Sequence, residues 1–204
     1  MMKKILYGVL CIMIVNSAAC RTNKGADAGV SGSPDKFIVM SFDDGPAEKT
    51  SLLLETLREN RIPALFFLVG QNIRDRPDDS RRIVADGHEI GNHSDGFAGL
   101  GTRGGAEESE IRRSLSAAQA AIEEITGGAS PYFRAPNLDY SDALGVVTQE
   151  MGMAFIGTTV SSRDWEGEIT TEQIIENVLN SAEDGGIILM HERHSGDLER
   201  TIRA

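Results

Sequence analysis

The chain has few cysteines and no excess of positive charge, and both absences restrict what it can be. Its two cysteines, Cys11 and Cys20, lie within the first twenty of 204 residues, so a domain that follows them contains no disulfide. The formal net charge is −11. That value argues against nucleic acid as a partner, because phosphate contacts need a basic surface. No internal period or linker divides the rest, and a chain of this length can bury a sizeable core as one domain.

The first twenty residues differ in character from the rest. Two lysines precede the apolar stretch from Ile5 to Val15, and small residues lead up to Cys20. This pattern is typical of a secretory signal and is too short for a membrane span. The sequence therefore predicts three segments: a signal peptide over residues 1–19, a flexible polar tether over 20–35 and one domain over 36–204.

Cys20 stands directly after the small residues and resembles the lipid-modified cysteine of a bacterial lipoprotein. Ser17 occupies the position three residues earlier, where leucine is usual. Two destinations remain open: an envelope lipoprotein anchored to the membrane through a lipidated Cys20, and plain secretion. In both the protein is exported, and no pattern indicates an oligomeric state.

From Phe37 onward, short apolar runs alternate with amphipathic segments. The apolar runs predict strands at 37–42, 64–69, 88–91, 132–134, 153–157 and 187–190. The helical patterns cover 48–60, 78–86, 107–126 and a segment that follows a capping box of Thr170 and Gln173. Such alternation predicts parallel strands joined by helices, hence an α/β barrel or open sheet with its chemistry at the carboxyl ends of the strands.

Polar residues that can carry chemistry follow five of these strands. They are Asp43 and Asp44, then Asn92 and His93, then Arg134, then Asp164 and Trp165, and finally His191. The adjacent acids at the first strand repel each other, and burying either one unpaired is costly. A divalent cation beside the pair would offset that repulsion. The alternative is an acidic pair that stabilises a helix N-terminus in solvent.

The segments SFDDGP, GHEIGNHS, YFRAP, RDW and ILMHE occur in this order. Together they resemble the motifs of the polysaccharide deacetylases, carbohydrate esterase family four, and the resemblance spans residues 36–204. It implies a distorted, TIM-barrel-like (β/α) barrel. It also implies a divalent metal that activates water to remove acetyl groups from a polysaccharide, with zinc first and cobalt or another divalent ion as the alternative.

The resemblance also implies a role for each matching residue. Asp43 matches the general base, Asp44 the carboxylate metal ligand and His93 the first histidine ligand. Arg134 matches the arginine that holds the base, and Asp164 matches the acid paired with an imidazole or guanidinium. Trp165 matches the aromatic wall of the pocket, and His191 matches the general acid. The N–H of Asn137 matches the donor to the oxyanion.

Two features depart from the family pattern. The second histidine of the family's H-x-x-x-H motif is replaced by Phe97, which cannot bind a metal. Three alternatives remain open: Asp95 is the substitute ligand, the glycine-rich loop 96–105 supplies another group, or the metal site is weak or absent. In addition, the chain stops at Ala204, where the family continues with one more helix and strand, so we expect a barrel without its closing elements.

The two remaining histidines do not complete the site. His88 lies inside a strand pattern, which favours a structural role. His194 does not form an H-E-x-x-H motif with His191, which indicates a loop residue beside the cleft.

Two functions therefore compete. The first is a metal-dependent deacetylase of a peptidoglycan or chitin-like N-acetylglucosamine polymer or of acetylated xylan; the second is a carbohydrate-binding pseudoenzyme with the same fold. An aspartyl phosphatase is disfavoured, because it needs two aspartates separated by one residue, whereas Asp43 and Asp44 are adjacent.

Overall fold

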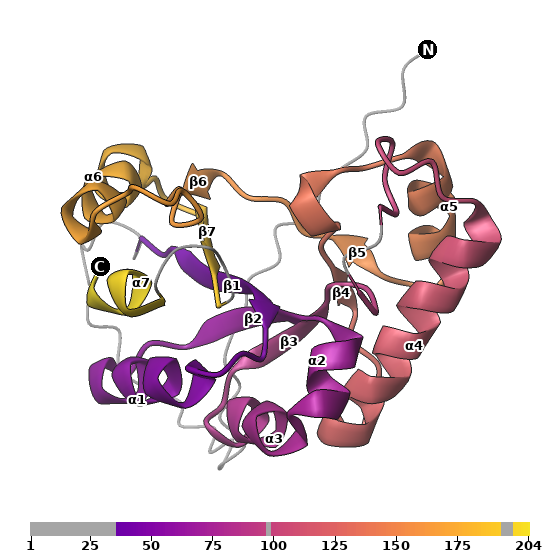
Figure 1. The fold of residues 1–204 in the computed structure, drawn as a ribbon, viewed down its shortest axis with the longest axis horizontal. Helices are drawn as coiled ribbons and strands as arrows, with labels where there is room; N and C mark the ends of the chain where they lie inside the picture. The colour runs from indigo at the N-terminus through magenta and orange to yellow at the C-terminus, as the bar shows by residue number, and fades with distance from the viewer. Residues whose placement is uncertain (1–35, 97–98, 193–197) are drawn as a thin grey trace, which may run out of the picture. The chain divides into compact units, whose positions relative to one another are not determined.

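The computed structural model describes residues 36–96, 99–192 and 198–204, and residues 36–204 form one compact unit (Figure 1). The predicted signal peptide and tether with Cys20, and also Phe97 and His194, lie outside the described residues. Their assignments stay predictions.

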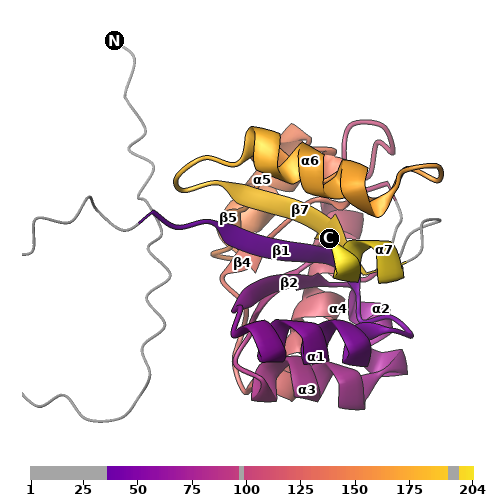
Figure 2. The same cartoon turned by 90° about the vertical axis from the view of Figure 1, so that its left-hand side faces the viewer.

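In the described part of the chain, seven parallel strands form one sheet in the order β5-β4-β3-β2-β1-β7-β6. Their bounds are β1 (Val39–Gly45), β2 (Ala64–Leu68), β3 (Glu89–Asn92), β4 (Tyr132–Phe133), β5 (Ala154–Phe155), β6 (Val160–Ser161) and β7 (Ile187–His191). The sheet curls into a half-barrel that carries helices on its outside (Figures 1 and 2). The predicted α/β class and barrel-like architecture are confirmed.

Helices connect most of these strands. They are α1 (Thr50–Asn60), α2 (Gly70–Asp75), α3 (Pro77–Ala85), α4 (Glu108–Thr126), the 3-10 turn η1 (Pro136–Leu138), α5 (Asp142–Glu150), α6 (Thr171–Ser181) and α7 (Leu198–Arg203). Among the helices of the described ranges, none has the length and apolar character needed to cross a bilayer.

Local sequence signals explain where the longer helices begin and end. The predicted capping box of Thr170 and Gln173 is present at the start of α6. α4 begins at a second capping box and ends at Gly127, whose φ of 80° suits a residue without a Cβ. Its apolar positions at helical spacing, including Ile111, Leu115 and Ile122, are buried. Side chains of this kind stabilise the fold by about 1.5–3 kcal/mol each when fully buried.

Besides the 3-10 turn η1, four elements were not predicted from the sequence: α2, α5, α7 and β6. Three of them are short, with six residues in α2, six in α7 and two in β6. Periodicity cannot identify segments of that length, because they complete fewer than two helical turns or one strand repeat.

Two apolar clusters form the core. The larger lies under β1, β2 and β7 and includes Phe42 and Phe66, whose ring centroids are 5.3 Å apart. The smaller lies among α4, α5 and β4 around Phe133. The two clusters hold the strands rigidly, so the residues that follow them are fixed in position.

Candidate active site

The first strand ends in two adjacent carboxylates, and both are buried. β1 pairs in register up to Asp43, and a bulge between Asp43 and Gly45 leaves Asp44 out of the ladder. Asp44 adopts φ of 71°, a left-handed conformation that Asp tolerates better than most residues. The Asn72 amide holds this turn by donating to the Asp44 carbonyl at 2.8 Å.

The imidazole of His93 lies against both carboxylates. Its Nε2 is 3.3 Å from Asp44 Oδ1 and 3.8 Å from Asp43 Oδ2. Its Nδ1 is 2.8 Å from the carbonyl oxygen of Arg134. Because a carbonyl only accepts, Nδ1 carries a proton, and Nε2 is the nitrogen directed at Asp44.

The electrostatic surroundings of His93 favour positive charge at Nε2. Burial lowers the pKa of His93, but the charge of Asp43, the hydrogen bond and charge of Asp44 and the bond to the Arg134 carbonyl outweigh it. The net result is a pKa above the ordinary value. A cation at Nε2, whether a proton or a metal ion, is therefore stabilised there.

Asp44 and His93 fit a divalent ion as two of its ligands. Two ligands that lie about 2 Å from one tetrahedral zinc ion are themselves about 3.3 Å apart, which matches the observed 3.3 Å. Within the described residues, however, no group of three or more His, Cys, Asp or Glu side chains is arranged to hold a metal ion. The described chain therefore provides two ligands, where catalytic zinc sites usually have three.

The described contacts of the Asp95 carboxylate are with α2, and the role of Asp95 as the substitute ligand stays a prediction. The Asp95 carboxylate accepts from Arg74 at 2.7 Å. It also lies against Gly70 at the start of α2, where an added Cβ would be 2.5 Å from Oδ1. The ion pair and this close packing hold the Asp95 carboxylate against α2.

Arg134 is fully buried and connects Asp43 to the far side of the half-barrel. Its guanidinium donates to Asp43 Oδ1 at 2.6 Å and to the Ser41 hydroxyl at 2.9 Å. It also donates to the carbonyls of Ile156 and Gly157, which follow β5. Arg134 thus holds Asp43 in one orientation, as the resemblance implied.

His191, Asp164 and Trp165 form a second group at the end of β7. Asp164 Oδ1 accepts from His191 Nδ1 at 2.7 Å, and Oδ2 accepts from the His191 backbone N–H at 2.8 Å. The Thr201 hydroxyl of α7 donates to the same Oδ2 at 3.1 Å. The Trp165 ring meets the His191 ring edge-on with centroids 5.3 Å apart. Asp164 therefore fixes the orientation of the His191 imidazole through Nδ1.

Asn137 lies in the 3-10 turn after β4, with φ of 57°. The backbone hydrogen bonds of that turn are donated by Leu138 and Asp139. The role of the Asn137 N–H as a donor to an anionic oxygen stays a prediction.

Sequence reasoning missed several residues that hold these groups. Ser41, Asn72 and Thr201 contact Arg134, the Asp44 carbonyl and Asp164 respectively. Ser41 lies two residues before Asp43 on β1, so the two side chains share one face of the strand. This spacing could have predicted that Ser41 lies beside the site. Asn72 and Thr201 lie in short helices that had no sequence signal.

His88 lies away from these groups. Its Nδ1 accepts from the Ala64 N–H at 3.2 Å, and its ring packs on Phe66. Burial lowers its pKa, opposed by the charge of Asp86. These contacts agree with the predicted structural role.

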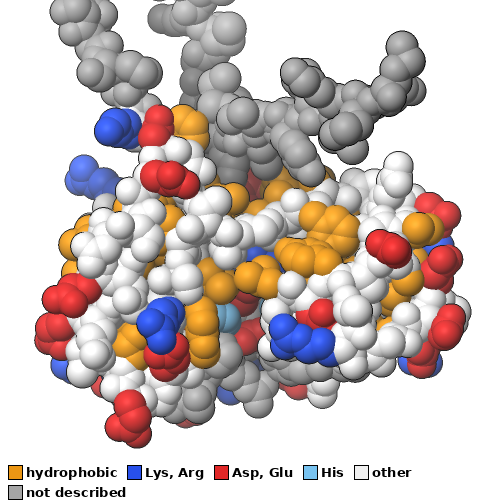
Figure 3. Space-filling model, turned by 90° about the horizontal axis from the view of Figure 1, so that it is seen from above, with side chains coloured by type: hydrophobic (Ala, Val, Ile, Leu, Met, Phe, Trp, Pro, Cys, Tyr) orange, Lys and Arg blue, Asp and Glu red, His pale blue; other side chains and the backbone are white. Residues whose placement is uncertain are grey.

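Histidine side chains reach the surface on one face of the molecule. Hydrophobic side chains gather around the middle of the face in Figure 3, and histidine atoms are visible between them.

Comparison with known proteins identifies relatives of this chain. The model of the family described as "Polysaccharide deacetylase" matches residues 31–156. A chitooligosaccharide deacetylase from Azorhizobium caulinodans is 36% identical over 157 residues, covering 76% of this chain and 73% of the relative.

Two solved structures are also similar. A family 4 acetyl xylan esterase from Clostridium thermocellum, solved with a cobalt ion, has a TM-score of 0.70 and 33% identity, covering 77% of this chain and 74% of its own. A carbohydrate esterase family 4 pseudoenzyme from Bacillus anthracis has a TM-score of 0.70 and 25% identity, covering 79% of this chain and 57% of its own. A mutant of that pseudoenzyme is described as having restored enzymatic activity.

Proposed function

Since this chain belongs to the polysaccharide deacetylase family, we propose that it hydrolyses acetyl groups from N-acetylglucosamine oligomers or polymers. The chitooligosaccharide deacetylase relative supports this class of substrate. An O-acetylated glycan is the alternative substrate, which the similarity to an acetyl xylan esterase supports.

The observation that carries the proposal is the pairing of two oriented acid–base groups on neighbouring strands. Asp43 on β1 lies opposite His191 on β7 in the strand register. Asp43 is held by Arg134, and His191 is held by Asp164. Each group is oriented by its own charged partner, so the proposed base and the proposed acid are held independently of each other.

The chain's residues can then carry out the reaction in two proton transfers. Asp43 accepts a proton from the attacking water, and the new oxyanion accepts a hydrogen bond from the Asn137 N–H. His191, once protonated, gives its Nε2 proton to the departing sugar nitrogen. The products are acetate and a free amine.

A divalent ion held by Asp44 and His93 would lower the pKa of a bound water and polarise the acetyl carbonyl. The cobalt ion in the acetyl xylan esterase structure supports a metal of this class. Because the described residues provide two protein ligands, we expect the divalent ion to bind more weakly than at sites with three protein ligands.

That incomplete ligand set also favours a second candidate function, a carbohydrate-binding pseudoenzyme. The similar pseudoenzyme shows that this fold exists without activity. Under this alternative, Trp165 and the surrounding surface would bind sugar and no acetate would be released.

Acetate release separates the two candidates. Purified protein is stripped with a chelator and incubated with N-acetylated chitooligosaccharides, with acetylated xylan as the second substrate. Zn²⁺, Co²⁺ or no ion is added. We expect acetate from at least one substrate with Zn²⁺ or Co²⁺ and far less without an ion; no acetate under any condition contradicts the proposed function.

We also propose that the protein is exported and acts on cell-envelope or environmental glycan. The N-terminal sequence supports this, and lipid attachment at Cys20 remains one of two routes. Labelling with a radioactive fatty acid in wild type and Cys20→Ala distinguishes a lipoprotein, which loses label in the variant, from a secreted protein, which is never labelled.

A further inference from the structure

A buried carboxyl that the proposed mechanism does not use lies beneath the turn that follows β1. Glu192 comes directly after His191 and is only 3% exposed. Its backbone N–H donates to the carbonyl of Asp43 at 2.9 Å. The backbone of Glu192 is thereby attached to the strand that carries the proposed base.

The side chain of Glu192 occupies the space that Gly45 leaves by having no Cβ. A Cβ at position 45 would lie 1.7 Å from Glu192 Oε1. The other oxygen, Oε2, accepts a hydrogen bond from the Thr50 hydroxyl. The Thr50 hydroxyl in turn accepts from the Ala47 N–H at 2.7 Å. One carboxyl therefore contacts both ends of the segment 45–50, which leads from Asp44 into α1.

The charges around Glu192 favour its neutral form. Burial raises the pKa of Glu192 to about 8; the hydrogen bond from Thr50 opposes this rise, and the negative charges of Asp79 and Asp44 add to it. Among the described residues Oε1 has no hydrogen-bond partner. A bare oxygen of this kind is tolerable on a neutral carboxyl and costly on an ionised one.

We propose that Glu192 is a positioning residue whose protonated carboxyl packs under Gly45 and, through Thr50, holds the turn that presents Asp43 and Asp44. When the Glu192 carboxyl loses its proton, a third negative charge arises next to Asp43 and Asp44. The turn is then held less firmly. The role of Glu192 in holding the turn does not depend on the proposed function. Only the effect of Glu192 on acetate release depends on it.

The direction of the pH effect follows from linkage. The folded-state pKa of about 8 lies above the ordinary value of 4.5, so the folded protein binds this proton more tightly than the unfolded chain. The contribution to stability is complete below pH 4.5 and is lost as pH rises through about 8.

Hydrogen exchange of the turn tests the proposal without any need for activity. The exchange of a peptide that spans Phe42 to Thr50 is followed near pH 6 and pH 9 and corrected for intrinsic rates. In wild type we expect about tenfold weaker protection at the higher pH, because Glu192 ionises there. Glu192→Gln, whose amide cannot ionise, should keep similar protection at both. The exposed Glu55→Gln serves as the matched control and should behave as wild type. An identical pH response in wild type and Glu192→Gln would overturn the proposal.

A second variant covers the case in which Glu192→Gln does not fold. Thr50→Val removes the hydroxyl that joins the carboxyl to Ala47, so the same peptide should exchange faster even near pH 6. Unchanged protection in Thr50→Val would also overturn the proposal.

Steady-state kinetics then show whether the turn matters for catalysis. We expect the ratio of kcat in Glu192→Gln to kcat in wild type to rise with pH, with KM changing little. Parallel pH profiles of kcat would show that Glu192 only stabilises the fold. If wild type releases no acetate with any ion, the proposed function fails, while the exchange experiment still decides the role of Glu192.

Discussion

Each buried charge at the end of the sheet has a defined partner, and that pairing assigns the residues their separate tasks. Asp43 pairs with Arg134, whereas Asp44 lies against His93. Both acids are buried, so an unpaired charge on either would be costly. The neighbouring acids thus have different chemistry because the bulge at Asp44 gives each of them a different partner.

Asp43→Asn should reduce kcat by about 10²–10⁴-fold, because the amide cannot accept the proton of the attacking water. Uptake of Co²⁺, followed by calorimetry, should change little. Asp44→Asn is the matched control and should lose Co²⁺ uptake instead. Full activity in Asp43→Asn would remove Asp43 from the role of base.

Phe97→His should restore the second histidine of the H-x-x-x-H spacing and raise the affinity for Zn²⁺ by about tenfold or more. Competition with a chromogenic chelator measures this affinity. Phe97→Leu, which adds no ligand, should match wild type. Equal Zn²⁺ affinity in the histidine variant and wild type would show that position 97 does not face the ion.

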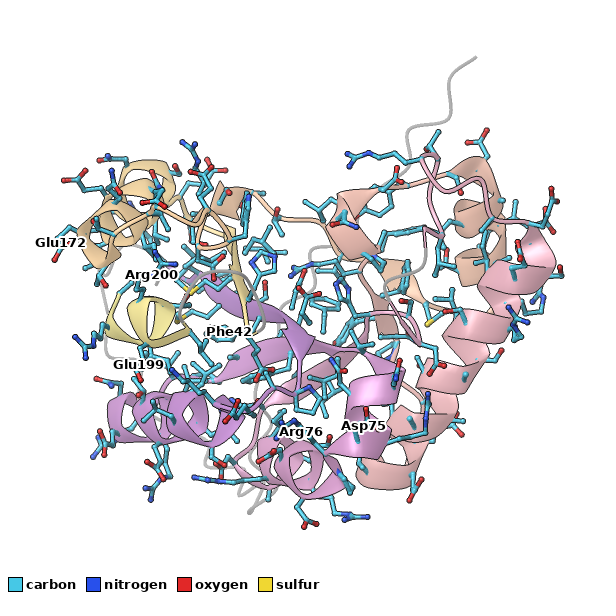
Figure 4. All side chains as sticks on the ribbon, in the orientation of Figure 1. Phe42, Asp75, Arg76, Glu172, Glu199 and Arg200 are labelled. Carbon is cyan, nitrogen blue, oxygen red and sulfur yellow. The ribbon has the colours of Figure 1, made fainter. Side chains whose placement is uncertain are left out.

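At the scale of elements, α7 contributes to the site although its sequence shows no sign of this. Lys49 at the start of α1 pairs with Glu199 at 3.1 Å, and Arg200 donates to the carbonyls of Gly167 and Ile169 (Figure 4). These contacts hold a six-residue helix that would not be stable alone. The helix places Thr201 on the carboxylate of Asp164.

Thr201→Val should lower kcat several-fold and the free energy of unfolding by about 1–3 kcal/mol, because Asp164 loses a donor to a buried charge. Urea unfolding and acetate release measure the two effects. Thr56→Val, at a half-buried position of α1 away from Asp164, is the control for the loss of a hydroxyl and should have little effect on kcat. A wild-type kcat in Thr201→Val would mean that the two contacts from His191 suffice to orient Asp164.

At the scale of the whole molecule, the sheet is open between its edge strands β5 and β6, and one side chain spans the interior. Arg134 comes from the end of β4 and reaches both the β5–β6 connection and β1. Its guanidinium also lies 4.0 Å from the Phe67 ring centroid of β2, an arrangement that stabilises a cation. A single residue therefore links strands from both halves of the curled sheet.

Arg134→Met should destabilise the protein by about 3–5 kcal/mol, because Asp43 is left as a buried charge without a partner. Urea unfolding measures the loss. Arg81→Met breaks an exposed ion pair with Asp78 and should cost less than about 1 kcal/mol. Similar losses in the two variants would show that Arg134 does not bridge the sheet in solution.

The sequence alone was enough to predict the α/β class, six of the strands to within a few residues, and the polar residues at their ends. It succeeded because apolar runs, capping boxes and short motifs are local, and because parallel strands bring their carboxyl ends to one edge. The motif order also led to the family that the comparisons support.

Only the tertiary structure decided which of those residues contact one another. Asp95 follows His93 by two residues, and in the fold its carboxylate pairs with Arg74 of α2. Thr201 and Glu192 contact Asp164 and Thr50 across long stretches of sequence. Such pairings depend on packing between distant segments, which no local pattern encodes.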